Sequence, residues 1–299
     1  MTATIEVRNL VKSYRQVQAV AGLDLTVESG ECVAVLGANG AGKTTMVEIL
    51  EGFRTRDSGQ VSVLGVDPAT GGRALRERVG VVLQSCAVER YLTVAELVRL
   101  HAGYYPHPRD VDEVLEMMGL AGKRDARVRT LSGGQQRRVD VALGIIGDPD
   151  LIFLDEPTTG FDPSARRTAW AMVENLRSLG KTVLLTTHYM DEAQHLADRV
   201  VVMARGRVVA EGRPDELGGR GEGAARVRFT LPDGVGVADL PMAVTPDGDA
   251  VVVETDKPTG VLHELTGWAV ARGVELSGLT VTRPSLEDIY LRLTGEEQR

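Results

Sequence analysis

Hydrophobic and polar positions follow two kinds of pattern in the strands that we expect in this chain. "TIEVRNL" (4–10) and "LDLTVESG" (23–30) alternate between apolar and polar residues, which predicts antiparallel strands with one buried face. "ECVAVLG" (31–37) is apolar almost throughout, as are "LIFLDE" (151–156) and "TVLLTTH" (182–188). Runs of this kind are typical of strands buried on both faces of a parallel sheet.

Helical patterns connect these strands. Residues 43–53 and 164–181 read as helices, the second a crossover between two buried strands, so strand, helix and strand predict a parallel α/β sheet. Residues 93–105 and 110–120 have the period of two short amphipathic helices, within a helical insertion that we place at about 86–147. Alternation over 198–212 around Arg205-Gly206 predicts a hairpin.

A second domain is indicated by a change in composition. "GGRGEG" (218–223) is a polar, Gly-rich linker, which places the first domain at 1–217 and the second at 224–299. The second domain reads as a small α+β fold with the following elements: strands at 225–231, 249–256 and 274–281, and helices at 259–273 and 285–293.

Composition favours an ordinary soluble protein. The 299 residues are 43% hydrophobic and 25% charged, and the net charge of −8 gives no electrostatic reason to expect nucleic acid. Two cysteines, Cys32 and Cys86, argue against a disulfide framework and fit a reducing cytosol, and both are expected to be buried, unreactive thiols. The N-terminus has no signal pattern, and no apolar run approaches the ~20 residues needed to span a bilayer. Any membrane role is therefore expected to come through a partner.

The segment "GANGAGKTT" (37–45) fits the phosphate-loop pattern G-x-x-x-x-G-K-[ST] between a buried strand and a helix. Glycines let backbone N–H groups converge on phosphate oxygens, a lysine supplies charge, and the following threonine supplies a hydroxyl to Mg²⁺. The sequence therefore predicts an ATP site made by Gly37, Asn39, Gly40, Ala41, Gly42, Lys43, Thr44 and Thr45.

Two acidic residues end a buried strand in "LIFLDE". Asp155 is expected to hold Mg²⁺ together with Thr44, and Glu156 is the expected general base that activates the attacking water. The alternative is a pair of solvated acids before the turn at Pro157.

A second phosphate-facing turn occurs in "LSGGQ" (131–135), at the start of an expected helix. With the ordered motifs above, it makes residues 3–215 resemble the ATP-binding-cassette (ABC) ATPases, the nucleotide-binding subunits of ABC transporters. The resemblance implies a head-to-tail dimer with a second copy of the chain. In that dimer, each copy caps the ATP of the other with Ser132, Gly133, Gly134 and Gln135.

Further residues take roles only through this resemblance. Gln84 matches the glutamine that contacts Mg²⁺ or the water, and His188 the switch histidine at the γ-phosphate, although a lone His after a strand is more often structural. Tyr14 matches the aromatic residue that stacks on adenine, the alternative being an ordinary strand residue. Asp162 matches the residue that couples the two sites. Phe161 and Ala38 replace the family's more usual Leu and Pro, which leaves the polar chemistry intact.

The C-terminal domain, which ends in "TRPSLEDIYLRLTGEE", resembles that of daunorubicin-resistance-type exporter ATPases. This implies an ATPase on the cytoplasmic side of the membrane, bound peripherally to an integral-membrane permease, with a drug or lipid-like cargo. The alternative is a soluble ABC ATPase that acts on ribosomes or DNA, a class that usually carries two cassettes.

The segment 85–97 is unusually apolar for a connector, with Ala87, Val88, Tyr91 and Leu92 along it. We expect it to form the docking surface for the permease. The alternative is that these side chains pack inside the helical insertion.

Overall fold

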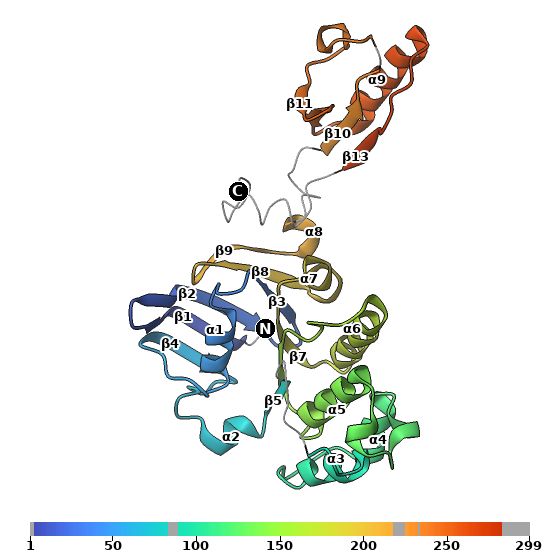
Figure 1. The fold of residues 1–299 in the computed structure, drawn as a ribbon. Coiled ribbons are helices and arrows are strands. Elements are labelled where there is room, and N and C mark those ends of the chain that lie inside the picture. The colour runs from blue at the N-terminus through green and yellow to red at the C-terminus, as the bar shows by residue number, and fades with distance from the viewer. Residues whose placement is uncertain (1–2, 83–88, 218–224, 233, 283–299) are drawn as a thin grey trace. The chain divides into compact units, whose positions relative to one another are not determined.

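The computed structural model describes residues 3–82, 89–217, 225–232 and 234–282. The chain divides into two compact units, Met1–Arg213 and Pro214–Arg299 (Figure 1). Among the features predicted from the sequence, Gln84, Cys86, Ala87, Val88 and the helix at 285–293 lie outside the described residues.

The first unit contains a three-stranded antiparallel sheet in the order β2-β1-β4. Its strands are β1 Ala3–Tyr14, β2 Val17–Glu28 and β4 Ser58–Val63. Burial alternates along β2, where Leu23, Leu25 and Val27 point into the core while Asp24 and Thr26 are exposed. The two alternating segments predicted as antiparallel strands are confirmed, and both strands are longer than the alternation indicated.

The second sheet of this unit has six strands in the order β5-β6-β7-β3-β8-β9. They are β3 Cys32–Leu36, β5 Val79–Val82, β6 Leu151–Asp155, β7 Thr182–Thr187, β8 Arg199–Ala204 and β9 Arg207–Gly212. All neighbours are parallel except β8 and β9, which form the hairpin predicted around Arg205-Gly206. The near-continuous burial of β3, β6 and β7 explains why their sequences do not alternate.

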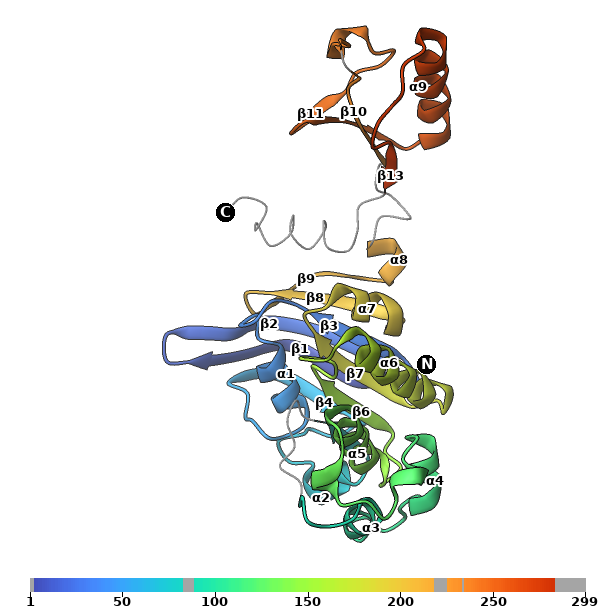
Figure 2. The ribbon, with the colours of Figure 1, turned by 45° about the vertical axis from the view of Figure 1, so that its right-hand side comes forward.

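Helices cover both faces of the six-stranded sheet. On one side, α1 (Lys43–Leu50) packs between this sheet and the antiparallel sheet, contacting β2, β4 and β6. On the other side, α6 (Pro163–Ser178) and α7 (Met190–Leu196) pack on β7, and α7 also packs on β3 (Figures 1 and 2). A short helix, α2 (Gly72–Arg76), precedes β5. Among the described residues, no helix combines the length and apolar character needed to cross a bilayer.

The helical insertion between β5 and β6 is confirmed. It contains α3 (Val94–Ala102), α4 (Val111–Met117), α5 (Gly133–Ile145) and the 3₁₀ turns Ala121–Lys123 and Val128–Thr130. Thr93 begins α3 with a capping box that pairs it with Glu96, and the Asp110 carboxylate caps α4. These caps fix where each helix starts. The three helices pack on one another, and α5 also contacts α6 and β5.

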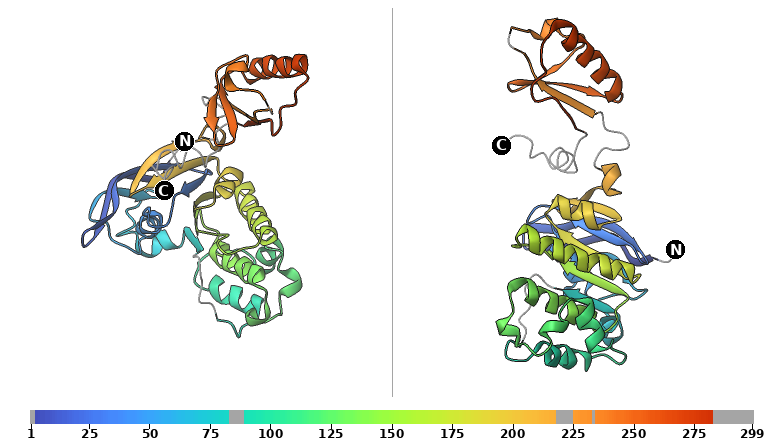
Figure 3. Two further views of the ribbon diagram at one scale, coloured as in Figure 1. Left: turned by 45° about the horizontal axis from the view of Figure 1, so that its top comes forward. Right: turned by 90° about the vertical axis from the view of Figure 1, so that its right-hand side faces the viewer.

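The second unit is an antiparallel sheet in the order β11-β12-β10-β13, with one long helix on one face (Figure 3). Its elements are α8 Pro214–Leu217, β10 Ala225–Thr230, the 3₁₀ turn Val237–Asp239, β11 Thr245–Asp247, β12 Ala250–Thr255, α9 Pro258–Arg272 and β13 Thr280–Thr282. Phe229, Leu265 and Val251 lie in its core. The opposite face carries the ion pairs Arg226–Glu254 and Arg228–Asp247.

The strand predicted at 274–281 is wrong for most of its length, since the strand covers only 280–282. Ser277 and Gly278 form a turn in which Gly278 adopts a φ of 66°. The carbonyl of Ser277 accepts a hydrogen bond from the backbone N–H of Thr230. The Ser-Gly pair is a turn signal that interrupts the alternation.

Candidate functional site

The glycines of the phosphate loop allow its backbone to lie close to neighbouring strands. Gly42 caps α1 with a φ of 102°, and a Cβ atom there would lie 2.2 Å from the carbonyl oxygen of Ala19. At Gly37, a Cβ atom would lie 2.6 Å from the carbonyl oxygen of Met203. Only glycine fits at either position. Within the loop, Asn39, Gly40 and Thr44 are exposed, Thr45 is half-buried and Ala41 is buried.

Lys43 lies inside this loop with its side chain only 5% exposed. Its Nζ atom donates hydrogen bonds to the carbonyl oxygens of Gly37 at 2.8 Å and Ala38 at 3.3 Å. Burial lowers the pKa of Lys43, and the nearby Glu156 carboxylate acts in the opposite direction. A buried cation at the N-terminus of a helix forms a binding site for phosphate oxygens.

Glu156 and His188 lie at the carboxyl edge of the same sheet, where β6 and β7 end beside β3. The Oε1 atom of Glu156 lies 3.6 Å from Nζ of Lys43 and 3.4 Å from Nδ1 of His188. Its Oε2 atom accepts a hydrogen bond of 3.0 Å from the hydroxyl of Thr159. Nδ1 of His188 is buried without a hydrogen-bond partner among the described residues. The structure therefore brings a carboxylate, a lysine and a histidine together at the phosphate loop.

Asp155 precedes Glu156, and its carboxylate contacts a residue of β7. Its Oδ1 atom accepts a hydrogen bond of 2.6 Å from the hydroxyl of Thr186, the residue opposite it on β7. The described residues contain no group of three or more His, Cys, Asp or Glu side chains that could by itself hold a metal ion. Mg²⁺ in nucleotide sites takes few protein ligands besides phosphate and water, so the oxygen donors of Thr44 and Asp155 fit this ion. The third expected ligand, Gln84, lies outside the described residues.

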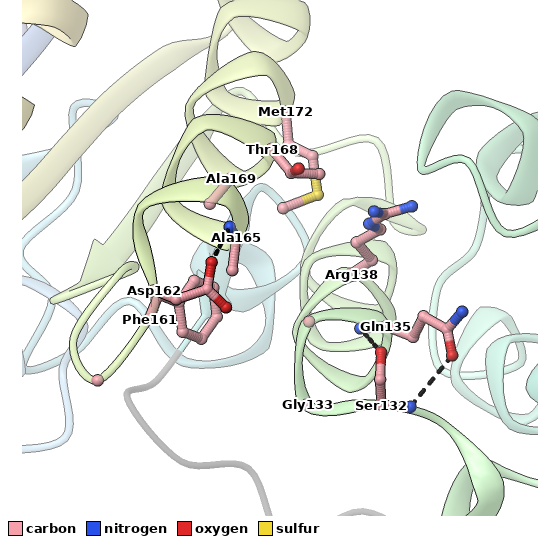
Figure 4. Close-up of a pocket in the computed structure, with 12 residues that line it drawn as sticks. Ser132, Gly133, Gln135, Arg138, Phe161, Asp162, Ala165, Thr168, Ala169 and Met172 are labelled. Carbon is pink, nitrogen blue, oxygen red and sulfur yellow. Dashed lines mark hydrogen bonds between the residues drawn. The ribbon is translucent and has the colours of Figure 1, made fainter.

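The second phosphate-facing turn, Leu131–Gln135, begins α5. Ser132 and Gln135 form a capping box in which each side chain accepts a hydrogen bond from the backbone N–H of the other. A pocket of about 560 Å³ separates this turn from the start of α6 (Figure 4). It is lined by Ser132, Gly133, Gly134, Gln135, Arg138, Gly160, Phe161, Asp162, Ala165, Thr168, Ala169 and Met172. Asp162 is fixed at its edge by accepting a hydrogen bond from the N–H of Ala165 at 2.9 Å. None of the phosphate-loop residues lines this pocket.

Tyr14 ends β1 with 37% of its surface exposed. Nζ of Lys12 lies 5.6 Å and Cζ of Arg54 lies 5.3 Å from the centre of its ring. Arg54 is in turn paired with Glu48 of α1. An exposed ring with cations beside it can stack on a purine base.

Sequence reasoning missed two residues at this site, Thr159 and Thr186. Both bind the acidic pair through hydroxyl groups. For Thr186 a signal was available: a threonine inside the apolar run 182–188 places a hydroxyl in a fully buried strand, where it requires a partner. For Thr159, in the turn after β6, the sequence offered no comparable signal.

A buried strand, a glycine loop and a helix, with two carboxylates and a histidine on the neighbouring strands, define a P-loop nucleotide-binding protein. The profile of the family described as "ABC transporter" matches residues 20–159, and that of the "ABC transporter domain-containing protein-like, C-terminal domain" matches residues 225–285. The chain is 38% identical to the "Nod factor export ATP-binding protein I" of Rhizobium meliloti (strain 1021), over 99% of this chain and 89% of that protein. It is 39% identical to the "Daunorubicin resistance ATP-binding protein DrrA3" of Streptomyces coeruleorubidus, over 99% of this chain and 97% of that protein. The chain belongs to the ATP-binding proteins of ABC transporters, a family of ATPases.

Solved structures agree with the fold of the first unit. CbiO1 from Clostridium perfringens, part of the ABC transporter complex CbiONQ, superposes with a TM-score of 0.67 at 29% identity, over 73% of this chain and 91% of that one. The ATP-binding cassette MJ0796, in a dimeric post-hydrolysis state bound to ADP and Pi, superposes with a TM-score of 0.62 at 25% identity, over 70% of this chain and 98% of that one.

Proposed function

We propose that this chain hydrolyses ATP at the site formed by Lys43, Glu156 and His188 and thereby powers a membrane exporter. One observation carries the proposal: a single carboxylate oxygen of Glu156 lies within 3.6 Å of Lys43 Nζ and 3.4 Å of His188 Nδ1. A base, a phosphate-binding cation and a switch residue are thus within reach of the same reacting group.

The chemistry assigns each residue a task. The backbone N–H groups of residues 37–45 and Nζ of Lys43 bind the β- and γ-phosphates, with Nζ exchanging its two carbonyl acceptors for phosphate oxygens. Glu156 accepts the proton of the attacking water, and His188 contacts the γ-phosphate. Thr44, Asp155 and Gln84 would hold Mg²⁺, which would neutralise charge on the phosphates. Tyr14 stacks on adenine.

We further propose that two copies of the chain assemble head to tail and that each completes the ATP site of the other. The pocket beside Ser132–Gln135 supports this, because it presents a helix N-terminus to an anion and none of its lining residues belongs to the phosphate loop. Asp162 lies in the same pocket, which suits a residue that couples the two sites. The similarity to a dimeric cassette supports the same arrangement. A two-fold interface then forms two identical sites.

The names of the relatives support an exporter. Proteins named for Nod factor export and for daunorubicin resistance align with this chain over 99% of its length. This disfavours the alternative of a soluble factor that acts on ribosomes or DNA. Because the two relatives are about equally similar and are named for different compounds, the cargo is assigned only to a class, a drug or lipid-like molecule. The partner is an integral-membrane permease, bound on the cytoplasmic side of the membrane.

The proposal is tested with the purified chain and with inverted membrane vesicles that contain the chain and its permease. We expect Mg²⁺-dependent ATP hydrolysis, and ATP-dependent uptake of a fluorescent drug or lipid into the vesicles. The Lys43→Ala variant should lose both. An active ATPase that supports uptake of neither probe class would contradict the assigned cargo, and a wild-type chain without ATPase activity would contradict the proposed function.

A further inference from the structure

The hydroxyl group of Thr186 binds both residues of the acidic pair. Thr186 lies on β7 opposite Asp155 and is fully buried. Its Oγ1 atom donates a hydrogen bond of 2.6 Å to Oδ1 of Asp155 and accepts one of 3.0 Å from the backbone N–H of Glu156. The carbonyl oxygen of Thr186 accepts from the same N–H at 3.1 Å. One buried side chain thus contacts the expected metal ligand and the expected base.

The contact with Glu156 holds a strained backbone. Glu156 has a φ of 44°, in the left-handed region that a residue with a side chain rarely adopts. Such a conformation persists only where the surroundings determine it. Here its N–H is bound on the β7 side by two oxygens of Thr186. The hydroxyl therefore contributes to the turn that directs the Glu156 carboxylate toward Lys43 and away from the course of β6.

The contact with Asp155 orients a carboxylate. A hydroxyl has one proton, and in Thr186 that proton is directed at Oδ1 of Asp155. A hydrogen bond to an ionised acceptor is among the stronger kinds. The hydrogen bond from Thr186 fixes the rotation of the Asp155 carboxylate. It engages Oδ1 and leaves Oδ2 outside this bond.

Strand formation does not require this hydroxyl. Valine has the same shape and is favoured in buried strands, and Val183, Leu184 and Leu185 fill the preceding positions of β7. A hydroxyl in such a place is unfavourable unless it is paired. Among the described residues, the hydroxyl of Thr186 is paired with Asp155 and Glu156 alone, so its contribution is to the site.

We propose that Thr186 is a positioning residue for ATP hydrolysis, which fixes the orientation of the Asp155 carboxylate and the backbone of Glu156. The inference rests on the proposed function, since it assigns to Thr186 the placement of the metal ligand and the base of that reaction.

The test compares Thr186→Val, Thr186→Ser and the matched control Thr182→Val. Thr182 lies at the other end of β7, is equally buried, and accepts a hydrogen bond of 3.0 Å from the N–H of Gly30. Thr182→Val therefore removes a buried hydroxyl from the same strand without touching the acidic pair. Thermal unfolding of all three variants reports whether each one folds.

We expect Thr186→Val to lower kcat roughly tenfold to a hundredfold, the effect of losing one strong hydrogen bond, with a smaller rise in KM for Mg²⁺–ATP. Thr186→Ser restores the hydroxyl and should return kcat to within about threefold of wild type. Binding of a fluorescent ATP analogue gives a second readout. In EDTA its affinity should be the same for wild type and Thr186→Val, whereas the gain in affinity on adding Mg²⁺ should be smaller in Thr186→Val.

Two results would overturn the inference: wild-type kcat and Mg²⁺ response in a folded Thr186→Val, or equal losses in Thr182→Val and Thr186→Val. If Thr186→Val does not fold, Thr186→Ser decides, because a folded serine variant with kcat roughly tenfold or more below wild type would contradict the role of the hydroxyl. A wild-type chain without ATPase activity would instead contradict the proposed function. In that case the gain in affinity for the ATP analogue on adding Mg²⁺ would still show whether Thr186 orients the Asp155 carboxylate.

Discussion

The Oε1 atom of Glu156 lies 3.6 Å from the Nζ atom of Lys43, and both side chains are largely shielded from solvent. The two residues come from different strand–loop units more than a hundred positions apart, yet the order β6-β7-β3 brings their loops to one edge of the sheet. The two side chains carry opposite charges when Lys43 is protonated and Glu156 is ionised. A phosphate group that binds Lys43 therefore also changes the field around Glu156.

Replacing Glu156 by Gln is expected to separate binding from hydrolysis. The amide keeps the shape of the side chain but cannot accept the proton of water, so hydrolysis should fall by about 10²–10⁴. Loss of the negative charge beside Lys43 should leave ATP binding intact or improve it. The variant should accumulate as an ATP-bound dimer on size-exclusion chromatography. Glu116→Gln, on the exposed face of α4, serves as control. Wild-type turnover in Glu156→Gln would remove Glu156 from the role of base.

Mixing two inactive variants tests the shared site. A Lys43→Ala chain paired with a Ser132→Arg chain has one site damaged twice and one site intact, so partial ATPase activity should return on mixing. Ser132 is chosen because it lines the pocket beside α6 and none of the phosphate-loop residues does. Ser178→Arg, which adds the same charge at the exposed end of α6, should remain active alone. Full activity of Ser132→Arg by itself would show that this turn only caps α5.

The local pattern of apolar and polar residues was sufficient to predict most of the strands and helices of the first unit. The apolar runs 31–37, 151–156 and 182–188 correspond to the three central strands, since a strand buried on both faces carries few polar residues. The order of these strands was not in the pattern, because neighbours in a parallel sheet can be distant in sequence. Nor could the pattern indicate the contact of Thr186 with the acidic pair, which depends on the register between β6 and β7.

In the second unit, prediction failed where strands are short. The three-residue strands β11 and β13 contain too few positions for alternation to show, and pairing with a longer neighbour decides their conformation. The turn at Gly278 had a signal in the Ser-Gly pair, but the apolar residues around it resembled a continuous strand.

Glu51 gives a prediction about pH. This carboxyl is buried at the end of α1, and its Oε1 atom has no hydrogen-bond partner among the described residues. Burial, with smaller effects of Asp155 and Glu48, raises the pKa of Glu51 from 4.5 to about 8. A carboxyl with a raised pKa stabilises the fold while protonated, so its contribution is complete below pH 4.5 and is lost as the pH rises through 8.

The variant Glu51→Gln should therefore be nearly as stable as wild type near the acidic end of this window and more stable than wild type at its basic end. The expected change in the free-energy difference between the two proteins is on the order of 5 kcal/mol across that window. Urea denaturation at the two pH values measures it, with Glu116→Gln as the exposed control. An equal stability difference at both pH values would show that the pKa of Glu51 is not raised in the folded protein.

The last prediction concerns the expected docking surface for the permease. Two of its residues, Tyr91 and Leu92, differ in exposure. Tyr91 is 69% exposed, and Cζ of Arg129 lies 5.6 Å from the centre of its ring. Leu92 is half-buried, and its carbonyl accepts a hydrogen bond from the N–H of Val128. Leu92 is thus the more enclosed of the two side chains, and Tyr91 is the better candidate for contact with a permease.

We therefore expect Tyr91→Asp to leave the ATPase activity of the purified chain unchanged and to reduce its co-sedimentation with permease-containing vesicles by about tenfold or more, as for the loss of an interface aromatic. Leu92→Asp should instead lower the melting temperature, because it places a charge in the packed part of the insertion. Tyr104→Asp is the matched control, since Tyr104 is 63% exposed and follows α3 in the same insertion. If Tyr91→Asp and Tyr104→Asp bind the vesicles equally well, Tyr91 is not part of the docking surface. Equal loss in both would indicate a general effect of negative charge near the membrane.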